Sequence, residues 1–364
     1  MVKYLPDMCD NLDSQRIPIT GSDRKTGSIP YYGASGVVDY VEKYIFDEEL
    51  LLVSEDGANL VMRNSPIAFS VSGKTWVNNH AHVLRFSDQW LRQYVELYLN
   101  SISLEPYITG TAQPKLNQQM LNNIPIPVPD ESQIRYIVTC TTCVHKLISL
   151  RKQQIAKLDE LVKARFVEMF GNIPAEEKKT MADVCKIITD GTHQPPKFSQ
   201  TGIPFLFVSN IVTNEIHYDA EKFISEETYS ELIKRTPIEI GDILLSTVGS
   251  YGHPAVVKSD RPFCFQRHIA YLKPNATMVN SEFLRGAILS ADVQKQIDER
   301  VKGIAQKTLN LSEIRKLQLP IPLMEQQEQF AAFVEQTDKS KLTIQQSLDK
   351  LELMKKALMQ KYFG

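Results

Sequence analysis

Hydrophobic residues change their spacing along this chain in an order that occurs twice. Over residues 1–110 they form short runs bounded by glycine, asparagine, aspartate and proline, which is typical of β-strands. The predicted strands are 37–41, 50–53, 67–71 and 82–86. Residues 89–99, with aromatic side chains on one side, are predicted to form a short helix. This mixture predicts an α+β domain.

Residues 172–302 repeat the same mixture of patterns. The predicted strands are 205–208, 243–247, 255–257 and 268–272, and a helix is predicted over 281–300. The fold class expected for the chain is therefore α+β, with two globular domains.

A proline run and a long stretch of helical spacing follow each globular region. Ile124–Pro129 must be extended, because proline disfavours helix in the residue before it. Asp130, with Gln133 three residues later, is a capping-box start for a helix that reaches about residue 170, roughly 60 Å in length. The predicted order is two globular domains, 1–110 and 172–302, each followed by a helical segment, 111–171 and 303–364.

The two helical segments are copies of one another. Residues 110–171 align with residues 303–364 at a constant offset of 193 and without a gap. Aligned identical pairs include Ala112 with Ala305, Gln113 with Gln306, Asn117 with Asn310, Pro127 with Pro320 and Leu158 with Leu351. The alignment continues weakly into the globular regions, where Asn78-Asn79-His80 matches Gln266-Arg267-His268. Two copies indicate a pseudo-twofold internal repeat and not a solenoid.

Both long helices carry an apolar seam at alternating spacings of three and four, the rhythm of a coiled coil. The seam positions are Ile148, Arg151, Ile155, Leu158, Val162, Arg165 and Met169, and then Lys341, Ile344, Leu348, Leu351, Lys355, Leu358 and Tyr362. Charged residues interrupt both seams, so neither helix is expected to be stable alone. The simplest arrangement pairs the two helices of one chain antiparallel, and the alternative is a homodimeric coiled coil. Apolar side chains predicted to be available to partners are Leu161, Phe166, Met354 and Leu358.

Composition and charge restrict the class of protein. The chain has 364 residues and a formal net charge of −2, but residues 1–110 carry 9 basic and 14 acidic side chains, whereas 111–171 carry 8 and 5. A nucleic-acid site, if present, must therefore be local. Five scattered cysteines are not a disulfide framework. Because no signal peptide or apolar run of 18 residues is recognisable, the expected compartment is the cytoplasm.

Catalytic signatures are largely missing from the sequence. Gly73-Lys74-Thr75 resembles the end of a P-loop, but Ala68 occupies the position of the required glycine. Cys140 and Cys143 form a single CxxC within a predicted helix. His80 and His82 alternate on a predicted strand and could share a metal, but without a companion carboxylate nearby a hydrogen-bonded pair is favoured. We expect no catalytic, metal-binding or cofactor-binding residues in this chain.

Polar and aromatic loop residues are the remaining candidates for function. Asparagine, glutamine, arginine and lysine side chains can bond base edges, and small hydroxyl side chains suit phosphates. For any one of these residues, an ordinary turn or strand cap is the alternative role. The DNA-binding candidates are Ser35, Asn59, Lys74, Trp76, Asn78, Asn79, His80, Thr192, His193, Lys197, Tyr251, Gln266, Arg267 and His268.

Several phrases together resemble one known family. IPYYGASGVVDYV, LLLVSEDGANL, WVNNHAHVLR and DGTHQPPKF, with each half closing on an LN…PIP segment and a long helix, are similar to the specificity subunit of type I restriction-modification systems. The resemblance implies two target-recognition domains that read the halves of a split DNA sequence, and an antiparallel helical spacer. It also implies two methyltransferase subunits carrying S-adenosylmethionine, and a motor and nuclease subunit using ATP and Mg²⁺.

Two other classes of protein stay open at this stage. The chain could be a nuclease with an unrecognised site, or a coiled-coil adaptor with no role on nucleic acid. The sequence does not supply the target bases, because base readout depends on the geometry of loops.

Overall fold

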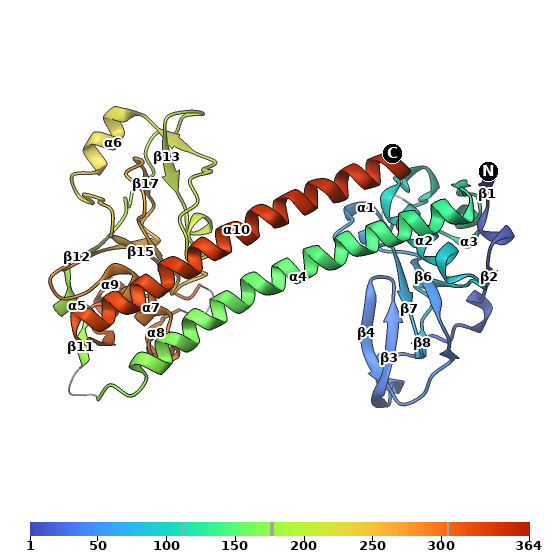
Figure 1. Ribbon diagram of the computed structural model, residues 1–364, viewed down its shortest axis with the longest axis horizontal. Helices are drawn as coiled ribbons and strands as arrows, with labels where there is room; N and C mark the ends of the chain where they lie inside the picture. Colours follow the sequence, from blue (N-terminus) through green and yellow to red (C-terminus); the bar gives the residue numbers. More distant parts are fainter. Residues whose placement is uncertain (111–112, 175–177, 304–305) are drawn as a thin grey trace. The chain divides into compact units, whose positions relative to one another are not determined.

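A computed structural model describes residues 1–110, 113–174, 178–303 and 306–364, so the aligned alanines Ala112 and Ala305 lie outside the described residues. The chain forms two compact units: unit 1 comprises Met1–Arg151 and Ser347–Gly364, and unit 2 comprises Lys152–Gln346 (Figure 1). The boundaries fall inside two 40-residue helices, α4 (Glu131–Phe170) and α10 (Met324–Phe363). Each unit therefore contains a globular domain and part of both long helices.

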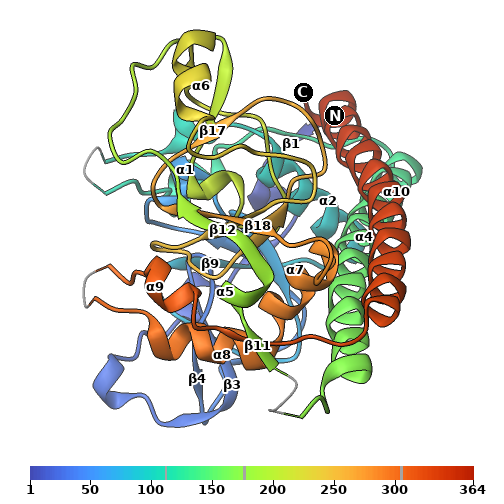
Figure 2. The ribbon, with the colours of Figure 1, turned by 90° about the vertical axis from the view of Figure 1, so that its left-hand side faces the viewer.

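Unit 1 is built from short strands and three helices beside the long ones. Its strands are β1 (Val2–Lys3), β2 (Asp10–Asn11), β3 (Thr26–Gly33), β4 (Gly36–Val41), β5 (Phe46–Asp47), β6 (Leu50–Ser54), β7 (Ala68–Val71), β8 (Lys74–Val77), β9 (Ala81–Arg85) and β10 (Ile126–Pro127). Its helices are α1 (Asn59–Met62), α2 (Gln89–Ser101) and α3 (Gln118–Asn122). The sheets have the orders β2-β9-β6-β7, β4-β3-β8-β5 and β1-β10. The β3–β4 hairpin lies at the end of unit 1 away from α4 (Figures 1 and 2).

Unit 2 repeats this plan. Its strands are β11 (Lys178–Thr180), β12 (Cys185–Asp190), β13 (Ile203–Leu206), β14 (Phe223–Ile224), β15 (Ile243–Ser246), β16 (Pro254–Val256), β17 (Cys264–Phe265), β18 (Ile269–Pro274) and β19 (Gln318–Pro320). Its helices are α5 (Met181–Val184), α6 (Glu226–Leu232), α7 (Ser281–Leu289), α8 (Ala291–Arg300) and α9 (Leu311–Ile314). The sheet orders are β12-β18-β15-β16, β14-β13-β17 and β11-β19.

Strand register confirms the internal repeat. Tyr31 pairs with Trp76 in the parallel β3·β8 ladder, and Phe205 pairs with Cys264 in the parallel β13·β17 ladder. The β6·β9 pairing and the β15·β18 pairing are both antiparallel, and each ends on a serine, Ser54 or Ser246. This register places His80 and His268 at equivalent positions, as the sequence alignment predicted. The α+β class is confirmed in both units.

The long helices begin and pair as predicted. The backbone N–H of Gln133 donates to the Asp130 side chain at 2.9 Å, which caps the start of α4. In unit 2 the Lys341 ammonium on α10 is paired with Asp159 on α4. In unit 1, Lys355 on α10 acts electrostatically on His145 of α4. The higher-numbered residue on α10 therefore lies beside the lower-numbered residue on α4. The helices are therefore antiparallel within one chain, and the seam residues are buried or half-buried.

The structure corrects two predictions about unit 2. The helix predicted over 281–300 is interrupted at Ser290, whose hydroxyl accepts from the backbone N–H of Val293 and starts α8 as a separate helix. Phe166, predicted to face a partner, is only 4% exposed. It packs in the core of unit 2 against Phe283 and Phe330, at centroid distances of 5.6 and 5.3 Å. Its assignment to a partner surface is therefore wrong.

Candidate nucleic-acid interface

The loop between β8 and β9 carries three of the predicted residues of unit 1, Asn78, Asn79 and His80. The Asn78 backbone N–H donates to the Tyr32 carbonyl at 3.0 Å, and its side-chain oxygen accepts from the His80 backbone N–H at 2.8 Å. Asn78 is 6% exposed, so its amide shapes the loop from inside. Asn79 and His80 are exposed on the outside of this turn.

Two further segments hold this loop in place. The backbone N–H of Glu55 donates to the His80 carbonyl at 2.9 Å, and the Asp56 carboxylate lies 2.8 Å from His80 Nδ1. The Glu55 carbonyl in turn accepts from the Leu116 backbone N–H at 2.7 Å. Segments around residues 55, 80 and 116 thus meet at one site, although they are far apart in the sequence.

Unit 2 has the same construction at its β17–β18 loop. The Gln266 N–H donates to Leu206 at 3.1 Å, the Thr247 N–H donates to His268 at 3.0 Å, and the Leu309 N–H donates to Thr247 at 2.8 Å. One contact is added here, because the Arg267 N–H donates to the carbonyl of Thr192 at 3.1 Å. This contact joins the predicted residues Thr192 and Arg267.

Other predicted residues are exposed and available for contact. Ser35 lies at the tip of the β3–β4 hairpin, and the Lys74 ammonium lies 4.9 Å from the centre of the Tyr44 ring. In unit 2, Lys197 is exposed, and His193 Nε2 lies 2.8 Å from the Asp190 carboxylate. Asp190 also pairs at 2.6 Å with Arg235, an exposed cation from the segment after α6.

Four predicted side chains use their polar groups in hydrogen bonds to other parts of the protein. Asn59 bonds both backbone groups of Ser65, and the Trp76 indole N–H donates to the Ile17 carbonyl at 2.6 Å. The other two are Thr192, whose hydroxyl donates to Gln194 at 2.9 Å, and Tyr251, whose hydroxyl donates to Asp298 at 3.0 Å. These residues fit the structural alternative, in which a polar loop residue serves as a turn or cap.

Charge differs between the two equivalent loops. Burial and the neighbouring Arg267 charge lower the pKa of His268, which favours its neutral ring. The cation of the Gln266–His268 loop is therefore Arg267, which is exposed. In unit 1 the equivalent Asn79 is neutral, and the neighbouring charge is the Asp56 carboxylate.

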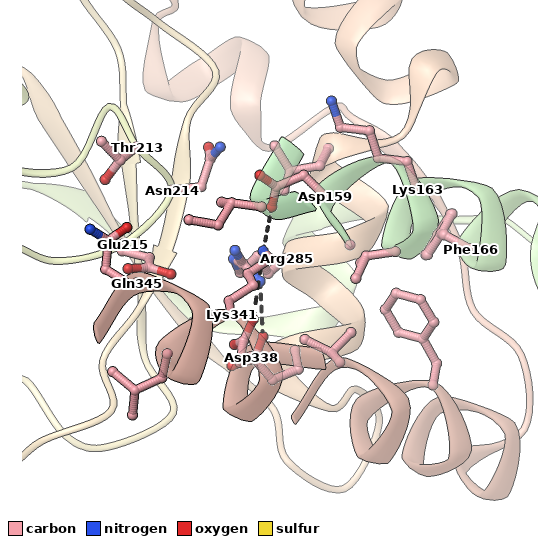
Figure 3. Close-up of a pocket in the computed structure, with 18 of the residues that line it drawn as sticks. Asp159, Lys163, Phe166, Thr213, Asn214, Glu215, Arg285, Asp338, Lys341 and Gln345 are labelled. Carbon is pink, nitrogen blue, oxygen red and sulfur yellow. Dashed lines mark hydrogen bonds and ion pairs between the residues drawn. The ribbon is translucent and has the colours of Figure 1, made fainter. Parts of the chain in front are cut away.

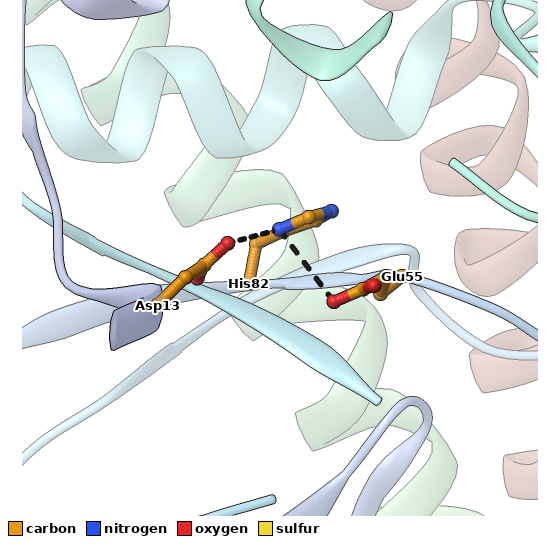
Figure 4. Close-up of side chains that lie close together, drawn as sticks. All are labelled: Asp13, Glu55 and His82. Carbon is orange, nitrogen blue, oxygen red and sulfur yellow. Dashed lines mark hydrogen bonds and ion pairs between the residues drawn. The ribbon is translucent and has the colours of Figure 1, made fainter. Parts of the chain in front are cut away.

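A buried ion-pair network lies beneath the loop of unit 1. His82 is 1% exposed, and its Nδ1 lies 2.6 Å from Asp13 (Figure 4). Its Nε2 lies 2.8 Å from the Leu116 carbonyl. Glu55 lies 3.9 Å from His82 Nδ1 and pairs with Arg16 at 2.6 Å and Lys115 at 3.1 Å. Each ring nitrogen faces an oxygen atom, Nδ1 that of Asp13 and Nε2 that of the Leu116 carbonyl.

This network differs from the expected arrangement, in which His80 and His82 form a hydrogen-bonded pair. Asp13, Glu55 and His82 offer ligand atoms within 4.8 Å of one another, the reach of a metal ion. However, Arg16 pairs with both carboxylates and Lys115 pairs with Glu55, so the geometry fits an ion-pair network better than a metal site. The favoured prediction, that His80 and His82 form a hydrogen-bonded pair, is wrong, because each bonds its own carboxylate from a distant segment.

A cavity of about 560 Å³ lies within unit 2, between α4, α7 and α10 (Figure 3). Its walls hold a chain of ion pairs, in which Lys341 joins Asp159 to Asp338. Lys258 then joins Asp338 at 2.7 Å to Glu282 at 3.1 Å, and Glu282 meets Arg285 at 3.4 Å. Positive and negative charges alternate along this series of ion pairs, and the alternation suits a polar contact between α7 and the long helices.

Sequence analysis missed the contacts made by one short segment in each copy of the repeat, which we call the straps. Residues 114–116 and 307–309 form these straps and bond the loop bases of their own units, and Asp13 bonds His82. The constant offset of the repeat was a usable signal, because the straps match across it. Their contacts were not visible in the sequence, because they join segments distant along the chain.

Comparison with known proteins identifies the class. The family model described as the type I restriction modification DNA specificity domain matches residues 1–160 and 176–353. A putative type I restriction enzyme specificity subunit of Haemophilus influenzae is 25% identical over 379 residues, covering 98% of this chain and 94% of that protein. The EcoBI specificity subunit of Escherichia coli is 29% identical over 146 residues, covering 40% of this chain and 31% of that protein.

Solved structures agree at the level of fold. The crystal structure of a type I restriction-modification S subunit from M. genitalium matches with a TM-score of 0.64 and 13% identity, covering all of this chain and 96% of that one. A chain from a structure on complex assembly and conformational transition of the type I R-M system matches with a TM-score of 0.55 and 15% identity, covering 100% and 97%.

The chain belongs to the type I restriction modification DNA specificity domain family, since the family model matches most of both units. Recognition of DNA sequence within a type I restriction-modification system is the function that this membership assigns. The two other classes considered from the sequence, a nuclease and a coiled-coil adaptor, gain no support from these comparisons. Among the described helices, none combines the length and apolar content needed to cross a membrane.

Proposed function

We propose that this chain is the non-catalytic reader of a type I restriction-modification complex, with each unit reading one half of a bipartite DNA target. The observation that carries this proposal is the repetition of one loop construction in both units. The Asn78–His80 loop and the Gln266–His268 loop have equivalent register and equivalent backbone anchors, but different exposed side chains. A shared frame with different side chains suits two half-sites of different sequence.

Within this proposal the DNA contacts come from exposed polar residues at the loop tips. Side chains whose polar groups remain exposed are Ser35, Lys74, Asn79, His80, His193, Lys197 and Arg267. Asn59, Trp76, Asn78, Thr192 and Tyr251 support the loops, and the half-buried Gln266 and His268 lie at the base of theirs. Three of the exposed residues, Lys74, Lys197 and Arg267, are lysine or arginine, so phosphate contacts would come largely from partner subunits. We expect weak, salt-sensitive DNA binding by the isolated chain.

The chemistry is proposed to reside in partner subunits, in the cytoplasm. Two methyltransferase subunits would carry S-adenosylmethionine and methylate adenine at N6 after flipping it from the stack. Restriction subunits would use ATP and Mg²⁺. Exposed apolar side chains on the long helices suit protein contact: Leu161 is 48% exposed and Met354 is 45% exposed, while Leu358 is half-buried.

A methylome comparison tests the reader role. Cells that carry the cognate methyltransferase subunit are sequenced by a long-read method with and without this gene. A split N6-methyladenine motif that disappears on deletion is the expected result. Unchanged motifs, together with normal co-purification of the methyltransferase, would contradict the proposal.

Co-purification tests the partner surface. Leu161→Asp and Met354→Asp should each reduce the amount of methyltransferase that co-purifies with the chain, because a charge at an apolar contact is costly to desolvate. Val38→Asp is a matched control, since Val38 is 57% exposed but lies on the β3–β4 hairpin. Equal recovery of methyltransferase with all three variants would remove these positions from the interface.

A further inference from the structure

The two equivalent loops differ in the kind of hydrogen bond that they offer. In unit 1, His80 Nδ1 lies 2.8 and 3.0 Å from the two oxygens of Asp56. An ionised carboxylate only accepts hydrogen bonds, so the proton of the ring is on Nδ1. In the neutral ring this leaves Nε2 as an acceptor. The His80 side chain is 48% exposed, and no other hydrogen bond to it occurs in the described part of the chain.

The rigidity of this arrangement comes from the backbone. Asp56 follows Glu55, whose N–H holds the His80 carbonyl at 2.9 Å, and Asp56 itself bridges to Lys115 in the strap segment. The Asp56 side chain is 15% exposed, so it acts from beneath the ring. Carboxylate and imidazole are therefore fixed relative to each other before any ligand arrives.

The equivalent loop of unit 2 offers hydrogen-bond donors where the loop of unit 1 offers an acceptor. His268 Nε2 accepts from Arg267 Nε at 3.4 Å, so the acceptor of this ring is already used. The Arg267 guanidinium makes no other side-chain hydrogen bond or ion pair among the residues that the structure describes, and it is exposed. A guanidinium group offers only hydrogen-bond donors. The Arg267 backbone is held on both sides, by Thr192 and by the β17–β18 turn.

We propose that the loops read bases of opposite hydrogen-bonding type: His80 Nε2 accepts from the exocyclic amine of an adenine or cytosine, and Arg267 donates to O6 and N7 of a guanine. The major groove presents these groups in patterns that distinguish the base pairs. This inference rests on the proposed function and adds to it the base class at one position of each half-site. Asn79 lies beside His80 but offers both a donor and an acceptor, so it does not by itself set this polarity.

The test uses the complex of the full chain with its methyltransferase subunits and a pool of DNA duplexes randomised across both half-sites. Methylated duplexes are sequenced. His80→Arg should change the preferred base at one position of one half-site from adenine or cytosine to guanine, with a loss of about 5- to 150-fold for the original base. His80→Lys should shift preference in the same direction. Arg267→Gln should change one guanine in the other half-site to adenine, the usual partner of glutamine.

The control is His217→Arg, at an exposed histidine of unit 2 that is bonded to Thr213 at 2.7 Å. It should leave both half-sites unchanged. A uniform loss of methylation with Arg267→Gln would indicate a phosphate contact and would overturn the assignment for unit 2. An unchanged base preference with both His80 variants would overturn it for unit 1. A wild-type complex that methylates no split motif would overturn the proposed function itself.

Discussion

His80 and His82 are two residues apart and have opposite surroundings. His80 is exposed and pairs with a carboxylate at the surface, whereas His82 is buried and both of its ring nitrogens lie within hydrogen-bond distance of oxygen atoms. Their difference arises because β9 begins at Ala81, after the turn that carries His80. At the scale of single residues, the chain uses the first histidine at its surface and the second inside the ion-pair network of Asp13, Glu55 and Arg16.

Replacing these histidines should have unequal effects on stability. His82→Ala leaves Asp13 and the Leu116 carbonyl without their donor in a buried site, and should lower the free energy of unfolding by about 3 kcal/mol. His80→Ala removes an exposed pair and should cost less than about 1 kcal/mol. Urea unfolding followed by circular dichroism checks both values. Equal costs would show that the buried network contributes no more than a surface pair.

The same network predicts sensitivity to acid. Burial would raise the pKa of Asp13 and Glu55, but hydrogen bonds and charges from His82, Arg16 and Lys115 outweigh burial and hold both pKa values below their usual range. A carboxylate with a lowered pKa stabilises the fold above its unfolded pKa, and this stability is lost as pH falls through the folded value. The melting temperature should therefore fall below about pH 4.5, the region of the unfolded glutamate pKa.

Glu55→Gln isolates this contribution to acid sensitivity. The variant should melt at a lower temperature than the wild type near pH 7, and the difference should shrink between about pH 5 and pH 3, as the wild-type carboxylate becomes protonated. Melting curves at several pH values provide the measurement. A difference that stays constant down to pH 3 would contradict a role for the ionised carboxylate.

At the scale of elements, close packing of α7 on the long helices depends on a glycine. A Cβ atom at Gly286 would lie 2.7 Å from a carbon of the Phe330 ring and 3.1 Å from the Phe166 ring. These rings belong to α10 and α4, and they form an aromatic cluster with Phe170 and Phe283. The helix pair is thus part of the core of unit 2.

Gly286→Ala should destabilise unit 2 although alanine favours helix. Crowding of well-packed aromatic rings costs about 1–3 kcal/mol, more than the gain of up to about 1 kcal/mol in helix propensity. Gly21→Ala is the control, because a Cβ at Gly21 meets no atom within 4 Å. Denaturant unfolding of the two variants tests this expectation. A more stable Gly286→Ala protein would show that the rings move aside easily.

At the scale of the whole molecule, α4 and α10 run through both units, and their proposed role is to set the spacing of the bipartite target. The target is expected to have half-site centres roughly 34 to 36 Å apart, about one turn of DNA. The heptad of residues 149–155 lies midway along α4 between His145 and Asp159, and the heptad of residues 345–351 lies midway along α10 between their partners Lys341 and Lys355. Deleting both heptads keeps the seam in register.

This double deletion should change the spacer of the methylated motif and leave the half-sites unchanged. Seven residues of helix correspond to about 10 Å, or about three base pairs of DNA. The methylome of cells that express the deletion variant measures the spacer directly. Deleting only one of the two heptads is the control, and it should disturb assembly because the helices no longer face each other in register. An unaltered spacer with the double deletion would refute the ruler role.

Local patterns in the sequence were sufficient to identify both long helices, the α+β class, the internal repeat and the family. The start of α4 depends on Asp130 and the preceding prolines, and the seam depends on a regular spacing, so both can be recognised from neighbouring residues. The equivalence of His80 and His268 followed from the repeat. Such features are determined by interactions over a few residues or by comparison of the chain with itself.

Only the tertiary structure decided which polar residues are available at the surface and which are used internally. Trp76 bonds the distant Ile17 carbonyl, Phe166 enters an aromatic core, and His82 bonds Asp13 from another segment. The break at Ser290 is a local exception, because its hydroxyl caps the backbone N–H of Val293 three residues later. Burial and hydrogen-bond partners come from segments brought together by folding, and the spacing of residues along the chain does not contain that information.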